Sequence, residues 1–397
     1  MVLLAVGGWS QTTVVSGTVV DAETREPVAG ASVSMGSVAV VTNDDGFFTL
    51  KSRERGEAVV VSHLGYGSQR ISIDALSDKT LMIVLKPAAI QLQEVLVMAG
   101  DARELVLAAI DRIPHNYPRK AELYHCFYRE KVMKRQNYIS VAEGVVDMYK
   151  TDYLRGVGRD RTAIRKGRRL LSPRQGDTLS VKVMGGPNYA VQLDVVKNDE
   201  FLLNAEELEH YELKMEMPTT IADRRQYVVS LTPCVTMDYA LYYGRFYIDQ
   251  ETLAFTRIEL ELDMRDPVKA TQALLVKKPL GLRFRPKELS LIADYRTGDD
   301  GLTRLSYLRT TMRFNCDWRR RLFATSFAAF CEMAVTNITS DGDVQPIRGR
   351  DSFDQRDAFF DKVDYFRDPA FWQDYNIIEP TESLDKAIDR LLKRHKK

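Results

Sequence analysis

The chain has 397 residues, of which 45% are hydrophobic and 28% charged, with 56 Lys and Arg against 55 Asp and Glu. This composition is typical of a globular protein and excludes a disordered tail, a coiled coil and a collagen. The length predicts two or three domains. The net charge of +1 gives no overall field that would draw the chain onto nucleic acid, and no apolar run reaches the roughly 18 residues of a membrane-spanning helix.

Residues 1–12 contain an apolar run followed by small and polar residues, which is the pattern at the end of a signal peptide. No basic residue precedes the run, so a frayed N-terminal strand stays open as the alternative. We interpret residues 1–12 as a signal-peptide remnant and expect an exported protein of the periplasm or the outer membrane.

Residues 13–98 show short apolar runs separated by turn signals every roughly 8 to 12 residues, which predicts a β-sandwich. The segment Asn43-Asp44-Asp45-Gly46 ends in a glycine that can adopt the positive φ of a tight hairpin. Its aspartates are also a residue type that binds calcium, but a calcium loop needs about six oxygen ligands, so we interpret the segment as a turn. The expected strands cover residues 14–20, 31–35, 38–42, 47–50, 58–63, 69–73 and 81–85.

Four motifs in this region point to one domain family. They are SGTVVDAETREPVAGASV from residue 16, TNDDGFFTL from residue 42, HLGY from residue 63 and LQEVLV from residue 92. Together they resemble the carboxypeptidase-regulatory-like domain of Bacteroidetes envelope proteins, which implies a transthyretin-like, Ig-like sandwich. In that family the domain also precedes the plug and barrel of many nutrient receptors, but the rest of this chain is too short for them. Relatives usually carry Gly where this chain has Arg25, so we expect Arg25 to avoid a positive φ.

The remaining chain predicts three further parts. A helical pattern begins at Asp101 and ends at Pro114, which indicates a helical connector at residues 99–118. Residues 119–345 return to strands, and the alternation of apolar and charged residues at 256–263 and 288–295 predicts an antiparallel sheet with one wet face. Residues 346–397 are expected to form a C-terminal helical arm. The fold class is therefore mainly β with minor α.

One hairpin in the β domain bears on function. Residues 243–257 resemble a strand-turn-strand unit in the half-barrels of periplasmic lipoprotein carriers, which implies a groove for a lipid. Nearby aromatic residues are a type that lines such grooves, but alternation divides them between the two faces, so we favour core and cross-strand packing. These residues are Tyr239, Tyr242, Tyr243, Phe246 and Tyr247.

We predict no catalytic, metal or cofactor site. A zinc carboxypeptidase needs His and Glu three residues apart to direct both at one metal, and none of the five histidines has a Glu at that spacing. No serine-hydrolase elbow, phosphate-binding loop or complete G-x-G-x-x-G motif occurs. The four cysteines have no C-x-x-C spacing, and a hairpin containing Cys316 and Cys331 would not pair these two, so free thiols are expected.

One basic segment stands out in this neutral protein, because residues 155–174 hold eight Lys and Arg and a single acid, Asp160. Its functional interpretation is contact with an anionic glycan, a lipid phosphate or an envelope protein. The alternative, which we favour, is a solvated strand edge whose charges discourage aggregation. The candidate contact residues are Arg155, Arg159, Arg161, Arg165, Lys166, Arg168 and Arg169. Residues 177–179, DTL, resemble a short O-glycosylation signal of exported Bacteroidetes proteins.

The sequence leaves three functions open. The first is a non-enzymatic binding or scaffold protein of the envelope, linked to nutrient uptake or envelope maintenance. The second is a carrier of an apolar ligand in the half-barrel, which a concave face filled by the protein's own side chains would contradict. The third is a hydrolase with dispersed acidic residues.

Overall fold

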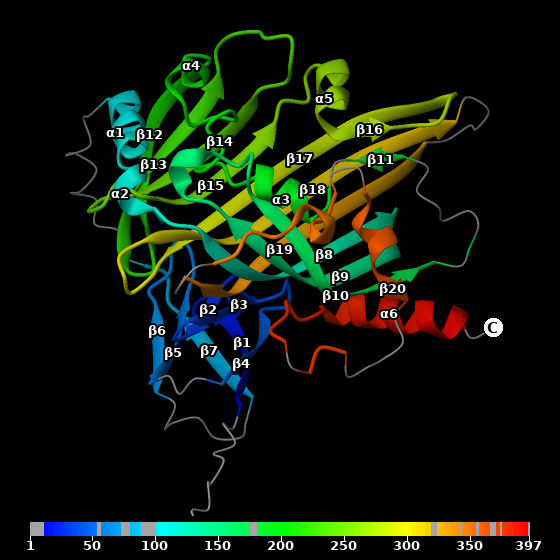
Figure 1. Ribbon diagram of the computed structural model, residues 1–397, viewed down its shortest axis with the longest axis horizontal. Helices are drawn as coiled ribbons and strands as arrows, with labels where there is room; N and C mark the ends of the chain where they lie inside the picture. Colours follow the sequence, from blue (N-terminus) through cyan, green and yellow to red (C-terminus); the bar gives the residue numbers. More distant parts are fainter. Residues whose placement is uncertain are drawn as a thin grey trace, which may run out of the picture.

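The computed structural model describes residues 12–53, 57–72, 80–88, 101–172, 174, 181–183, 185–318, 324–340, 344–354, 357–365, 371–373 and 375–395 (Figure 1). Residues 1–11 of the predicted signal-peptide remnant, the LQEVLV motif and the DTL motif lie outside the described residues. No helix among them is both long enough and apolar enough to cross a membrane.

The N-terminal part is a β-sandwich, as the sequence predicts. Its two sheets have the strand orders β4-β1-β7 and β3-β2-β5-β6, and their facing apolar side chains, among them Val19, Phe48 and Val59, are fully buried. All seven expected strands are present, with ends within two residues of the prediction. They are β1 Thr13–Asp21, β2 Ser32–Met35, β3 Val38–Val41, β4 Phe47–Ser52, β5 Ala58–Ser62, β6 Gln69–Ser72 and β7 Leu81–Leu85.

The expectation for Arg25 is wrong, because this residue has a φ of 61°. The turn after β1 closes on Asp21, whose Oδ1 accepts the backbone amides of Glu23 and Thr24, each at 2.7 Å. The amide of Arg25 then donates to the Asp21 carbonyl at 3.1 Å. These bonds hold position 25 in the left-handed region whatever its side chain, so the chain keeps a glycine-like conformation with an arginine.

The turn at residues 43–46 forms as predicted. Asn43 Oδ1 accepts the amides of Asp45 and Phe47 at 3.0 and 2.9 Å, and Gly46 has a φ of 73°. A β-carbon on Gly46 would lie 2.5 Å from the carbonyl oxygen of Val19, which is backbone and has no room to move. Gly46 is therefore required both by its φ and by this close approach.

We expect Gly46→Ala to lower the free energy of unfolding by about 1–3 kcal/mol, because it adds backbone strain and a backbone clash. The matched control is Gly30→Ala. Gly30 has a φ of 72°, but no atom lies within 4 Å of a β-carbon added to it. Gly30→Ala therefore adds backbone strain without a clash and should lower the free energy of unfolding by about 1 kcal/mol. Urea unfolding measures both values, and equal losses would contradict the clash.

The rest of the chain is built on one sheet of 11 strands in the order β12-β13-β14-β15-β17-β18-β19-β8-β9-β10-β20. All neighbours are antiparallel except β10 and β20. The pairing of β19 with β8 joins its two halves, with Phe327 opposite Lys134 and Thr339 opposite Leu123. The strands are β8 Glu122–Lys134, β9 Asn137–Lys150, β10 Arg161–Leu171, β12 Tyr211–Ile221, β13 Arg224–Pro233, β14 Tyr242–Asp249, β15 Phe255–Leu262, β17 Leu282–Thr297, β18 Thr303–Trp318, β19 Thr325–Thr339 and β20 Asp364–Tyr365.

Short elements complete the large domain. Asp101 caps the connector helix as expected, because its Oδ1 accepts the amide of Arg103 at 2.8 Å. The connector is divided into α1 and α2, and the link between β10 and β12 crosses the sheet with α3 and α4. The elements are α1 Ala102–Asp111, α2 Ile113–Asn116, η3 Tyr153–Arg155, β11 Lys182–Val183, α3 Pro187–Gln192, α4 Ala205–Leu208, α5 Pro267–Leu274 and β16 Leu275–Lys277.

The large sheet is covered on one face and covered in part on the other (Figure 1). One face, here called the inner face, carries Tyr124, Val146 and Leu291 and packs against α1, α2 and the crossing segment at residues 187–208. The other, here called the outer face, carries Phe127 and Tyr307 and packs against the sandwich and the C-terminal segment. The cover of the outer face is partial, because Arg245 of β14 and Glu261 of β15 remain exposed on it, as expected for a wet face.

Among the described residues of the C-terminal part, the one α-helix is α6 Glu382–His395, with Leu384, Ile388 and Leu391 buried at helical spacing. Before α6, the described residues form two short 3-10 turns, η5 Gly349–Asp351 and η6 Phe359–Lys362, the strand β20 and irregular backbone. Thus the described residues of the expected helical arm before α6 are not α-helical. Pro380 contributes to this, because it disfavours the α conformation at Glu379.

Candidate functional site

The inner face of the large sheet carries a packed core. The helix α1 buries Val106 and Ala109, and the crossing segment adds Leu202 and Leu203 against the sheet residue Phe246. In β14 and β15 the predicted division of aromatic residues holds: Phe246 faces this core, whereas the Tyr247 hydroxyl donates to Glu259 at 3.1 Å on the outer face. The hairpin at residues 243–257 is present, but within the described residues its inner side is occupied by the protein's own side chains.

Two lysines and two aspartates form a buried network at the edge of this core. Lys150, at the end of β9, places its Nζ 2.5 Å from Asp194 Oδ2, and Lys197 Nζ lies 2.7 and 2.8 Å from the two carboxylate oxygens of Asp160. All four residues are at most 4% exposed. The network fixes the crossing segment, which holds Asp194 and Lys197, to the ends of β9 and β10.

Asp194 is the centre of the network. Its carboxylate accepts the hydroxyls of Tyr153 at 3.1 Å and Tyr295 at 2.9 Å in addition to Lys150. Burial raises the pKa of both tyrosines well above their usual range, and Asp194 adds to this effect. The two hydroxyls therefore remain donors, and the buried carboxylate has a complete set of partners.

Lys197 has a lowered pKa. Burial and the nearby Lys150 ammonium lower its pKa to about 8, against the opposing effect of Asp160. A lysine with a lowered pKa is a candidate nucleophile. Here, however, Nζ also donates to the carbonyl and hydroxyl of Thr151 at 2.7 and 3.0 Å, so oxygen atoms already surround it. The geometry indicates a structural ammonium.

A polar pocket of about 520 Å³ lies beside this network. Asp160, Arg161, Asn188 and Asp354 contribute polar side chains to its wall, with Phe353 and Val191 as apolar members. Asn188 also bonds to Thr162 and the Phe353 carbonyl, which ties α3 to β10 and to the C-terminal part. This pocket suits a small polar molecule better than a lipid chain.

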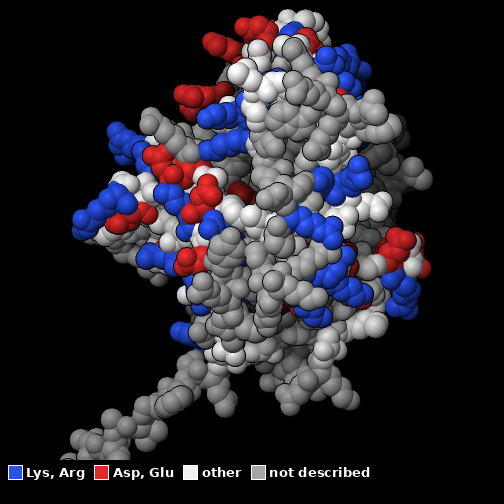
Figure 2. All heavy atoms as spheres, turned by 90° about the vertical axis from the view of Figure 1, so that its right-hand side faces the viewer, with Lys and Arg blue, Asp and Glu red and all other residues white. Residues whose placement is uncertain are grey.

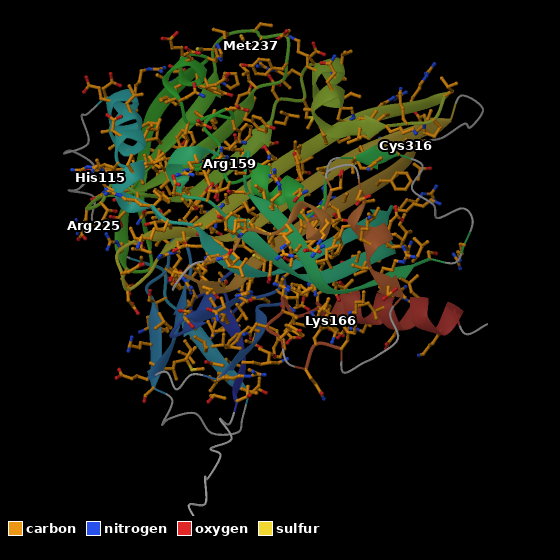
Figure 3. The ribbon with its side chains drawn as sticks, viewed as in Figure 1. His115, Arg159, Lys166, Arg225, Met237 and Cys316 are labelled. Atoms are coloured by element: carbon orange, nitrogen blue, oxygen red, sulfur yellow. The ribbon has the colours of Figure 1, made fainter. Side chains whose placement is uncertain are left out.

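The seven basic residues of the predicted contact do not form one patch. Arg159 and Lys166 lie in different parts of the molecule (Figure 3). Arg168 is buried, and its Nε donates to Glu143 Oε2 at 2.9 Å. Lys166 Nζ donates to the Phe371 carbonyl at 2.8 Å and lies 4.1 Å from the centre of that ring. Alternation along β10 and its bulge between Ile164 and Lys166 direct these side chains to different surroundings.

The other members keep part of their surface. The side chains of Arg155 and Arg165 are each 61% exposed, although they pair with Asp152 and Asp147. Arg161 donates to nearby carbonyls, and Arg169 lies over the Phe360 ring with its guanidinium carbon 4.8 Å from the centroid. Arg159 is exposed. Binding of an anionic partner by these residues stays a prediction.

A second buried network crosses the outer face and holds the C-terminal segment. Glu143 accepts Arg129 Nε at 2.7 Å as well as Arg168, and the other end of Arg129 donates to the Ile378 carbonyl at 2.6 Å. The Arg168 guanidinium carbon lies 4.9 Å from the centre of the Trp372 ring, which meets Phe127 edge to face at 5.6 Å. Sheet and segment are thereby joined by charge and by aromatic contact.

The N-terminal sandwich is attached to the same segment. Lys51 exchanges two backbone hydrogen bonds with the Asn376 side chain, at 2.7 and 2.8 Å. The two aspartates considered as calcium ligands also serve this joint: Asp44 pairs with Arg309 of β18 at 2.8 Å, and Asp45 accepts the amide of Glu382 at 2.7 Å. Their carboxylates point to different partners, which supports the turn interpretation.

A chain of hydrogen bonds on the outer face has the order of a hydroxyl, an imidazole and a carboxylate. Thr339 Oγ1 lies 3.1 Å from His125 Nε2, and His125 Nδ1 lies 2.9 Å from Asp147 Oδ1. Asp147 also accepts Arg165. These partners are what a buried carboxylate requires, and they explain the arrangement without a reaction. Among the described residues, no group of three or more His, Cys, Asp or Glu side chains is placed to hold a metal ion.

The four cysteines are free. In the hairpin of β18 and β19, Cys316 faces Thr325 and Cys331 faces Thr310, so the two thiols are not paired, as expected. Burial raises the pKa of the Cys331 thiol to about 12, which keeps it protonated. Cys234 is exposed.

Sequence reasoning missed both buried networks. Lys150, Asp194, Arg129 and Glu143 are separated along the chain and come together only through strand register and the crossing segment. The one signal was Asp160, a single acid in a basic segment, and the structure shows it neutralising Lys197.

Comparisons with known proteins define the N-terminal part. Residues 15–97 match the family of CarboxypepD_reg-like domains. The sandwich is therefore a carboxypeptidase-regulatory-like domain, here joined to a large antiparallel sheet. No curated protein matches the chain.

Comparison with solved structures gives weak likenesses. A DUF1329 family protein from Desulfovibrio piger is 10% identical over 62% of this chain and 96% of its own, with a TM-score of 0.28. A putative outer membrane lipoprotein-sorting protein domain from Vibrio parahaemolyticus is 9% identical over 62% and 94%, with a TM-score of 0.27. A LolA superfamily protein from Nitrosomonas europaea is 12% identical over 60% and 95%, with a TM-score of 0.21. Scores this low carry no conclusion about what the chain binds.

Proposed function

We propose that this chain is a non-enzymatic binding or scaffold protein of the cell envelope, in the periplasm or at the outer membrane. The observation that carries the proposal is the packed inner face of the large sheet, where α1 and the crossing segment supply Val106 and Leu202 to the core. A carrier needs this face open for its ligand. The proposal links the protein to nutrient uptake or envelope maintenance.

The charged groups support the same proposal. Two deeply buried acids, Asp194 and Glu143, each at most 2% exposed, already have full sets of partners within the protein. A catalytic acid or base must instead reach a substrate proton. Meanwhile the sandwich, the sheet and the C-terminal segment are joined by Lys51, Arg129 and Trp372, so the two β domains form a fixed platform.

Native mass spectrometry of the protein, gently extracted from its own envelope, tests the proposal. We expect the mass of the chain alone or with a second protein, and no lipid in a stoichiometric amount. A stoichiometric lipid would overturn the proposal in favour of the carrier. A tightly bound metal together with peptidase turnover would overturn it in favour of the hydrolase.

A further inference from the structure

One end of the large sheet presents an apolar apex surrounded by basic residues. The turn between β16 and β17 exposes Leu280 completely, at 100%, and Val276 of β16 is 52% exposed. Residues 275–287 contain five Lys and Arg and no acid, in a chain whose net charge is +1. All five side chains are exposed: Lys277, Lys278, Arg283, Arg285 and Lys287.

The apex is held on a firm base. Leu282 and Phe284 alternate with the exposed arginines and enter a core in which Phe284 packs 4.9 Å from Phe314. Lys278 Nζ donates to the Leu282 carbonyl at 3.2 Å, and Gly281 supplies the positive φ of 80° that reverses the chain. The ordered turn therefore holds Leu280 in a fully exposed position.

Most of this positive charge is not neutralised locally. Arg285 pairs with Asp317 at 3.1 Å. For Lys277, Arg283 and Lys287, no ion-pair partner exists among the described residues. At the surface of an anionic membrane, the unpaired cations can bind lipid headgroups. The exposed leucine can leave water for the acyl chains.

The basic character continues across neighbouring strands at the same end. Leu282 of β17 faces Trp318 of β18, and Phe327 of β19 faces Lys134 of β8, which places the turn with the exposed Arg135 at this end as well. Cys316 marks the end in Figure 3. Figure 2 looks at this side of the molecule and shows Lys and Arg side chains on it, with Asp and Glu side chains among them.

We propose that this end of the sheet docks on a membrane surface rich in anionic lipid, with Leu280 inserted among the acyl chains and the surrounding Lys and Arg on the headgroups. The proposal rests on the proposed function and names the partner. An anionic surface complements the charge, and a fully exposed leucine among the charged residues suits insertion. A nucleic acid or an acidic protein would use the charges but gain nothing from Leu280.

Co-sedimentation of the full chain with lipid vesicles tests this proposal. We expect binding to vesicles of phosphatidylethanolamine with phosphatidylglycerol, weakening as salt is added, and little binding to phosphatidylcholine alone. Neutralising each lysine should weaken the affinity about fivefold, so Lys277→Gln with Lys278→Gln should weaken it roughly 25-fold. Leu280→Ser should weaken it about tenfold.

Matched controls change the same chemistry elsewhere. Met82→Ser removes another exposed apolar side chain, 74% exposed, and Lys86→Gln with Lys120→Gln removes two other exposed charges. These controls should bind vesicles like the unchanged protein, and all variants should keep its unfolding midpoint. Equal losses in variants and controls, or no vesicle binding by the unchanged chain, would overturn the proposal.

Two further outcomes separate the possible partners. If the chain binds short duplex DNA or polyglutamate as tightly as vesicles and Leu280→Ser changes nothing, the surface contacts polyanions in general and the membrane proposal fails. If vesicle binding is absent while native mass spectrometry still finds a protein partner and no stoichiometric lipid, this proposal fails and the proposed function stands.

Discussion

Asp194→Asn is expected to lower the free energy of unfolding by about 3–5 kcal/mol, because it removes one charge from a buried ionic network and leaves Lys150 unbalanced. After the change, the nearest remaining carboxylate is Asp160, whose Oδ2 lies 3.8 Å from Lys150 Nζ and is already held by Lys197. Urea denaturation, followed by tryptophan fluorescence, measures the loss.

A double variant tests the physical cause. Lys150→Met together with Asp194→Asn removes both members of the pair, so no unbalanced charge remains. Only one of the two tyrosine hydroxyls, Tyr153 or Tyr295, keeps its oxygen acceptor in the new amide, because they bind different oxygens of Asp194. We expect the double variant to be more stable than Asp194→Asn alone. If the stability losses of Lys150→Met and Asp194→Asn, measured singly, add up to the loss of the double variant, the Lys150–Asp194 contact contributes no stability of its own.

The N-terminal sandwich could be predicted almost strand by strand, because its information is local. Short runs such as residues 81–85 alternate in burial, and glycines such as Gly46 mark turns that need a positive φ. The failure at Arg25 has a physical origin. The conformation there is set by hydrogen bonds to Asp21, and composition at one position does not reveal such a constraint.

The larger domain could be predicted only as a class. Alternation in β15 and β17 indicates an antiparallel sheet with one wet face, but it does not determine which strands pair. The strands β19 and β8 are about 200 residues apart in the chain, and their pairing brings His125 next to Thr339. The segment before β12 covers the inner face through contacts that are also distant in the chain. Non-local register of this kind is not encoded in a short window.

The candidate surfaces show the same limit. The basic segment at residues 155–174 was conspicuous, yet strand geometry buries Arg168 and turns Lys166 toward Phe371. The basic segment at residues 275–287 is as evident in the sequence, because five cations occur without an acid. Its significance depends on the exposure of Leu280, which only the folded chain shows.

Glu143→Gln is expected to release the C-terminal segment from the outer face. The substitution leaves the buried Arg129 and Arg168 without their shared carboxylate, and Arg129 holds the Ile378 carbonyl. We expect a loss of about 3–5 kcal/mol in the free energy of unfolding. Hydrogen exchange and limited proteolysis should show earlier opening at residues 375–395 than in the sandwich. The control Glu382→Gln breaks an exposed pair with Lys386 in α6 and should leave stability unchanged.

The same network predicts an acid-sensitive joint. Burial raises the pKa of Glu143, but Arg129 and Arg168 outweigh it, so the pKa is lowered. For Glu332, burial likewise opposes Lys131 and Arg129, and the pKa falls to about 2. Both folded pKa values lie below that of an unfolded glutamate, about 4.3. Their contribution is therefore complete above that pH and is lost as the pH falls toward 2.

Below pH 4.3, unfolding experiments on the unchanged protein should thus show stability decreasing steeply with pH, and the C-terminal segment opening first. Glu143→Gln has no carboxyl to protonate at this position, so its stability should decrease less steeply over the same window. Parallel pH profiles for the two proteins would show that Glu143 does not hold the segment through its charge. If the stability of Glu143→Gln depends less on pH and its C-terminal segment is already open at neutral pH, the carboxylate shared by Arg129 and Arg168 holds this segment on the sheet.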